Sequence, residues 1–208
     1  MNTPDIDEIM KRTASYVFED GIGEIYWGFL LILIGLLFFV DAVWKPPIRS
    51  FSAIGLALLS LGGYRLGRWL VPAIKRRLTF PRTGFVAYRQ LSGTRRWMEM
   101  GITVLVASVI AAVVSVLGVS GVGYNWIPLA DGLVAGAFLV YLGSQVGLRR
   151  FQLLAGFSGL AAVAIFLSGL GDTLGSAAYF AAMGLALTVS GSLVLWAYLH
   201  QTPRPEEQ

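Results

Sequence analysis

The chain has 208 residues, of which 56% are hydrophobic and 13% are charged, with a formal net charge of +4. Soluble domains carry about 25% charged residues, so this composition excludes that class and indicates an integral membrane protein. The chain has no cysteine and one histidine, His200. Disulfides, thiolate nucleophiles and cysteine-based zinc sites are therefore excluded, and histidine-based metal sites or Ser–His pairs are disfavoured. We expect no catalytic residue, no metal and no cofactor.

Residues 1–23 are predicted to form an amphipathic cytoplasmic arm. The acidic residues there and the basic pair Lys11 and Arg12 do not match a signal peptide, which begins with a basic stretch. Five side chains, four of them apolar, share one helical face of the arm: Ile6, Ile9, Met10, Thr13 and Val17. Because the arm is acidic overall, we expect it to dock on the basic segment that follows the second membrane span.

Charged residues delimit six apolar runs, each interpreted as a transmembrane helix: residues 25–40, 50–64, 100–117, 132–148, 151–171 and 173–199. A spanning helix needs about 20 residues. The predicted fold is all-α, a polytopic membrane bundle whose six helices form three hairpins, at residues 24–71, 97–148 and 149–200. The second helix is expected to end at Val71, because a proline follows it.

The distribution of lysine and arginine predicts the orientation of the chain. Fourteen of these residues lie in the N-terminal arm, the even-numbered connections and the C-terminal tail, and only Lys45 and Arg49 lie on the other side. Lysine and arginine accumulate in cytoplasmic connections. Both termini, including the tail at 201–208, should therefore be cytoplasmic, in a multi-pass protein of the cell membrane.

Residues 72–96 form a predicted basic cytoplasmic loop that we expect to contact anionic lipid headgroups or a partner protein. Its arginines are Arg76, Arg77, Arg82, Arg89, Arg95 and Arg96. Membrane orientation already explains this charge, so no nucleic-acid partner is expected. A Pro-Arg-Thr-Gly turn at 81–84, with apolar residues on both sides, is compatible with a short β-hairpin or with an irregular loop.

The string RLTFPRTGFV at residues 77–86 resembles a segment of uncharacterised multi-pass inner-membrane proteins of bacteria. In those proteins the aromatic positions are often tyrosine. The resemblance implies a location in a bacterial plasma membrane. It implies no catalytic or binding residue.

Ionisable groups near the spans are the first candidates for function, because they are costly inside a membrane. Glu24, Asp41 and Glu99 are expected at helix ends, solvated at the interface. Asp172, in a Gly-Leu-Gly-Asp string, matches a pattern of intramembrane aspartyl proteases. That chemistry needs a second aspartate facing the first, and no span supplies one.

A loose polar face is predicted on the fourth span, from Asp131 through Tyr141 to Gln145, with Thr188 of the last span as a further candidate. We interpret these residues as an interhelical hydrogen-bond network. The alternative is a transporter or channel for a small solute or lipid, with this face lining the pathway.

Small residues recur four positions apart, which lets helices approach closely in a membrane. They are Gly63 and Gly67, Gly132 and Gly136, Gly143 and Gly147, and Ala178, Ala182, Ala186 and Ser190. The last set could instead face a second copy or another membrane protein. The sequence as a whole predicts a non-catalytic membrane protein that acts through helix packing and contacts at the cytoplasmic face.

Overall fold

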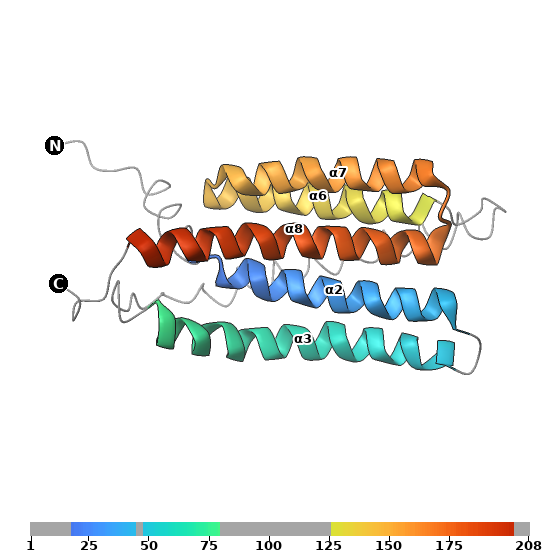
Figure 1. Ribbon diagram of the computed structural model, residues 1–208, viewed down its shortest axis with the longest axis horizontal. Coiled ribbons are helices and arrows are strands. Elements are labelled where there is room, and N and C mark those ends of the chain that lie inside the picture. The colour runs from blue at the N-terminus through green and yellow to red at the C-terminus, as the bar shows by residue number, and fades with distance from the viewer. Residues whose placement is uncertain (1–17, 45–47, 80–125, 202–208) are drawn as a thin grey trace, which may run out of the picture. The chain divides into compact units, whose positions relative to one another are not determined.

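The computed structural model describes residues 18–44, 48–79 and 126–201, all of which belong to one compact unit (Figure 1). Five helices make up this part of the chain: α2 (Ile22–Val43), α3 (Ile48–Leu78), α6 (Ile127–Val146), α7 (Arg149–Ser168) and α8 (Asp172–Gln201). No strand occurs among these residues. The predicted span at residues 100–117, and most of the segment proposed as a β-hairpin, lie outside the described residues.

Four of the helices, α2, α6, α7 and α8, are long and apolar enough to cross a membrane. Large apolar side chains also cover the outward faces of these helices. On α7, for example, Leu153, Leu160 and Leu167 are 74–76% exposed. A large apolar surface of this kind would be unstable in water but is well solvated by lipid tails. The structure thus confirms the expected all-helical fold, with four helices that are suited to a membrane.

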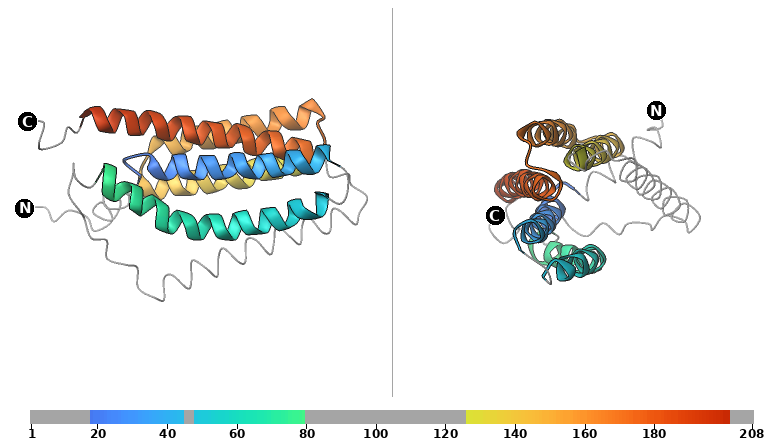
Figure 2. Two further views of the ribbon diagram at one scale, coloured as in Figure 1. Left: turned by 60° about the horizontal axis from the view of Figure 1, so that its bottom comes forward. Right: turned by 90° about the vertical axis from the view of Figure 1, so that its right-hand side faces the viewer.

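Helix α8 contacts α2, α6 and α7, whereas α3 contacts α2. Figures 1 and 2 show α8 between the α6–α7 pair and α2. The connection between α6 and α7 is short because Gly147 adopts a left-handed conformation, with φ at 73°, and its N–H bonds to the Gly143 carbonyl at 2.8 Å. This is the usual way in which a glycine ends a helix.

Helices α2 and α8 pack through small residues spaced seven positions apart. The opposed pairs, in antiparallel order, are Gly21 with Gly191, Gly28 with Gly184, and Gly35 with Ala177. A Cβ atom added to Gly184 would lie 2.6 Å from the Gly28 carbonyl oxygen, too close for any side chain. A repeat of seven keeps one seam of each helix in contact along a left-handed crossing. We call this seam the glycine zipper.

Most glycines of the pairs predicted from spacings of four also pack inside the chain. An added Cβ on Gly63 would meet Leu30 and one on Gly67 would meet Tyr26, both on α2, and Gly132 faces Ala162 of α7. Gly63, Gly67 and Gly132 therefore serve packing between helices of the same chain, whereas Gly147 ends α6 and has no neighbour at the position of a Cβ atom.

The predicted end of the second helix at Val71 was wrong, because α3 continues through Pro72 to Leu78. The missing N–H of Pro72 leaves a carbonyl one turn earlier without its donor. Pro72 is exposed, so water or lipid headgroups can replace that donor. Contacts of Lys75 and Thr79 with Asp20, described below, hold the turns beyond the proline. Because Leu78 is the last residue of α3, a β-strand of the predicted hairpin cannot begin there.

Candidate functional site

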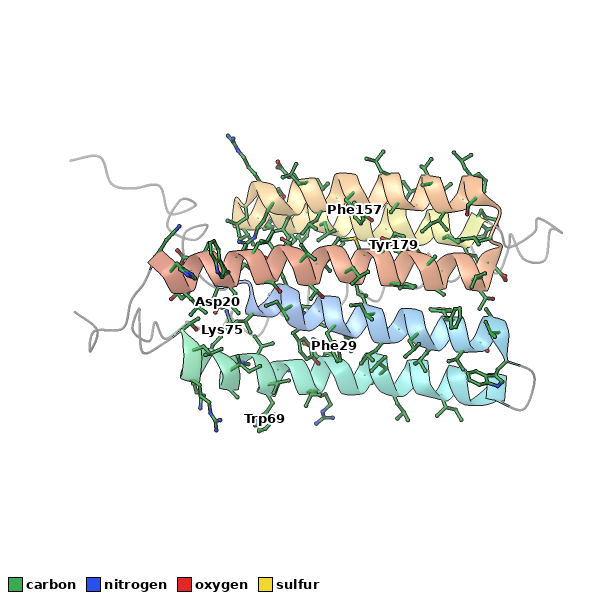
Figure 3. The ribbon with its side chains drawn as sticks, viewed as in Figure 1. Asp20, Phe29, Trp69, Lys75, Phe157 and Tyr179 are labelled. Carbon is green, nitrogen blue, oxygen red and sulfur yellow. The ribbon has the colours of Figure 1, made fainter. Side chains whose placement is uncertain are left out.

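Two ion pairs with buried carboxylates gather at the end of the unit where α2 begins and α3 ends. The first is between Asp20 and Lys75, whose Oδ1 and Nζ atoms are 2.9 Å apart. Asp20 also accepts hydrogen bonds from the Ile22 N–H at 3.2 Å and from the Thr79 hydroxyl at 3.3 Å. Figure 3 shows Asp20 and Lys75 side by side, between the start of α2 and the end of α3. This pair fixes the end of α3 to the residues that precede α2.

The second ion pair is between Glu24 of α2 and Arg150 of α7. Arg150 Nη2 lies 2.7 Å from Glu24 Oε1, and the Ser190 hydroxyl of α8 donates to Glu24 Oε2 at 2.9 Å. Arg150 also donates to the carbonyl of Phe18. The Glu24 side chain is 3% exposed, so the expectation that it is solvated at the interface was wrong. Its charge is instead compensated by groups from two other helices.

We call Asp20, Glu24, Lys75 and Arg150 the ionic cluster. It contains two carboxylates and two cationic groups, so its formal charge is zero. Buried charges are stable only when paired and hydrogen-bonded, and each carboxylate here has a cation and a hydroxyl as partners. None of these carboxylates is available as a general base or metal ligand without breaking the cluster.

A second set of polar groups lies between α6, α7 and α8. Ser158 of α7 donates to the Gly132 carbonyl at 2.9 Å and lies 2.7 Å from the hydroxyl of Tyr179, which is fully buried. Asp131 accepts a hydrogen bond from Ser176 at 2.9 Å. These contacts join α6 to both neighbouring helices and form an interhelical network of the predicted kind, with mostly different members.

The structure does not bring together the four residues predicted to form a polar face. Asp131 contacts Ser176, and the Thr188 hydroxyl bonds to the Gly184 carbonyl of its own helix at 2.8 Å. Tyr141 is 58% exposed and Gln145 is also exposed. The position of each residue along its apolar run gave its depth in the helix but not the direction in which it faces.

Of the six arginines predicted to contact lipid headgroups, Arg76 and Arg77 belong to the last turns of α3 and are exposed. The other four, Arg82, Arg89, Arg95 and Arg96, lie outside the described residues. Within the described ranges, no group of three or more histidine, cysteine or acidic side chains could hold a metal ion.

No protein family, curated protein or solved structure matches this chain in the comparisons with known proteins. The arguments about function below therefore depend on the residues and their contacts.

Proposed function

We propose that this protein is a non-catalytic, multi-pass protein of the bacterial inner membrane. In this proposal it acts as a rigid helical scaffold whose basic end contacts anionic lipid headgroups and protein partners at the cytoplasmic face. The observation that carries the proposal is the ionic cluster. Its buried charged groups compensate one another, and they hold four segments of the chain together.

The glycine zipper supports a rigid scaffold rather than a moving one. Helices α2 and α8 cannot slide along each other without bringing larger side chains to positions where a Cβ atom would overlap the opposite backbone. Between α6, α7 and α8, the hydrogen bonds of Ser158 and Tyr179 fix a second contact. A helical membrane protein whose central helix is fixed on both sides is suited to presenting its ends to other molecules.

The orientation is proposed from the charges at the helix ends. Exposed arginines occur at the end of α3 and the start of α7, at the same end as the ionic cluster. An end rich in exposed arginine is typical of the cytoplasmic face. We place both chain termini on that side.

Labelling of single cysteines tests this orientation cleanly, because the natural chain contains none. Arg77→Cys marks the basic end and Trp44→Cys marks the opposite end. In intact cells, a membrane-impermeant maleimide should label Trp44→Cys at once and Arg77→Cys only after permeabilisation. Labelling of Arg77→Cys in intact cells would overturn the proposed orientation.

Transport of a small solute or lipid along α6 is the competing function. Asp131 bonds to Ser176 and Thr188 bonds to its own helix, whereas Tyr141 and Gln145 are exposed. The four residues therefore do not line one pathway, which favours the scaffold. Proteoliposomes loaded with a small anionic dye, or carrying a fluorescent phospholipid, should show no more flux or flip-flop than protein-free vesicles. Protein-dependent flux that is lost in both Asp131→Asn and Tyr141→Phe would overturn the non-catalytic scaffold in favour of transport.

A further inference from the structure

One face of α3 carries exposed cationic and aromatic side chains near the basic end. Arg65, Arg68 and Trp69 are all exposed, Trp69 to 70%. Figure 3 shows Trp69 pointing away from α2. The opposite face of α3 packs against α2 through Gly63 and Gly67. The arginines and the indole are therefore directed away from the helix that α3 contacts.

These arginines differ from the cations of the ionic cluster in having no carboxylate partner in the described part of the chain. Helix α3 itself contains no acidic residue. The only interaction of Arg68 in this part of the structure is with an aromatic ring: its Cζ atom lies 5.9 Å from the centroid of Tyr64. Such a contact orients the guanidinium but leaves its N–H donors available.

The length of α3 sets the depth of this face. A helix of 31 residues is about 46 Å long, whereas the hydrocarbon core is about 30 Å thick. Because α3 packs along α2, which is long and apolar enough to cross a membrane, the basic end of the longer α3 extends into the headgroup region and beyond. Tryptophan prefers the headgroup level, and arginine side chains reach toward it from below. Trp69 thus marks headgroup depth. Arg76 and Arg77, expected from the sequence to contact lipid headgroups, lie about two turns farther out, in water, and so do not contact a headgroup bound beside Trp69.

We propose that Arg65, Arg68 and Trp69 form a binding site for the headgroup of one anionic phospholipid in the cytoplasmic leaflet. Positions three apart on a helix have Cβ atoms about 5–6 Å from each other, so both guanidinium groups can bind one phosphate. The indole packs beside the glycerol region of the same lipid. This inference rests on the proposed function only in requiring the basic end of α3 to lie at the membrane interface.

The site is tested by native mass spectrometry of the full-length protein released from micelles that contain phosphatidylglycerol or phosphatidylcholine. The wild type should retain one phosphatidylglycerol preferentially. R65Q/R68Q should bind it on the order of tenfold more weakly, because each arginine near an anionic group contributes to binding. The matched control is R76Q/R77Q, which removes the same charge farther from the membrane and should stay within about twofold of the wild type.

Three results would overturn the lipid site. Equal losses in both double variants would mean unspecific attraction to the membrane surface. Displacement of the lipid by millimolar inorganic phosphate would mean a site for a soluble anion. A lower melting temperature of R65Q/R68Q without any lipid would mean that the arginines bind another part of the chain. If Arg77→Cys is labelled only after permeabilisation, each of these results rejects the lipid site without affecting the proposed orientation.

Discussion

The guanidinium of Arg150 lies 2.7 Å from the carboxylate of Glu24, although the two residues belong to helices at different ends of the chain. Ser190 of a third helix bonds to the other oxygen of the same carboxylate. One buried negative charge therefore holds α2, α7 and α8 in register. The strength of that link can be measured by removing each partner in turn.

Arg150→Gln should lower the free energy of unfolding by about 3 kcal/mol, because it leaves the carboxylate of Glu24 buried without a cation. The measurement is reversible unfolding in mixed micelles, titrated with a denaturing detergent. Arg149→Gln is the control, since Arg149 is the exposed neighbour of Arg150, and it should change stability by about 0.5 kcal/mol or less.

The double variant Glu24→Gln with Arg150→Gln completes the cycle. Its loss should be clearly smaller than the sum of the two single losses, because each single variant leaves one charge unpaired whereas the double variant leaves none. Additive losses would contradict a direct ion pair.

The glycine zipper predicts opposite effects for the same substitution at two glycines. Gly184→Ala should destabilise the protein by about 2 kcal/mol or more, because the new Cβ meets the Gly28 backbone and α2 must move away from α8. Gly156→Ala places a Cβ in open space on α7 and should raise stability by up to about 1 kcal/mol through helix propensity. Thermal unfolding of the two variants in the same detergent gives the comparison. Equal effects would show that α2 and α8 are not in backbone contact.

Two tyrosines differ in the environment of their hydroxyl groups: that of Tyr179 is buried and hydrogen-bonded, and Tyr141 is exposed. Tyr179→Phe removes the contact with Ser158 and should lower stability by about 0.6–1 kcal/mol, the usual size of such bonds in membrane proteins. Tyr141→Phe should be neutral, because Tyr141 is 58% exposed. Detergent-induced unfolding of both variants measures the difference. A larger loss for Tyr141→Phe would restore the polar face predicted on α6.

The helical membrane architecture could be predicted because it depends on composition and on the lengths of apolar runs, both of which are local properties. The ionic cluster could not. Glu24 and Ser190 are 166 positions apart, and nothing near either residue indicates the other. A carboxylate next to an apolar run looks the same in sequence whether it faces water or a cation.

The glycine zipper, in contrast, has a recognisable pattern in the sequence. Gly21, Gly28 and Gly35 are spaced by seven, as are Gly184 and Gly191. A search for spacings of four finds the pairs on α3 and α6 but misses this repeat. Seven residues return a helix to nearly the same face, so matching periods in two apolar runs predict that the runs pack against each other.

Asp20 provides the last prediction, because it holds the end of α3 from outside that helix. Its carboxylate contacts both Lys75 and Thr79, so Asp20→Asn should loosen the last turns of α3. Trypsin needs locally unfolded chain, and it cleaves after Lys75, Arg76 and Arg77. Cleavage there should become several-fold faster in Asp20→Asn, as followed by mass spectrometry of the fragments. Glu19→Gln, at the exposed neighbouring position, removes the same charge and should leave the rate unchanged. If both variants are cleaved at the wild-type rate, the end of α3 is held by contacts other than those of Asp20.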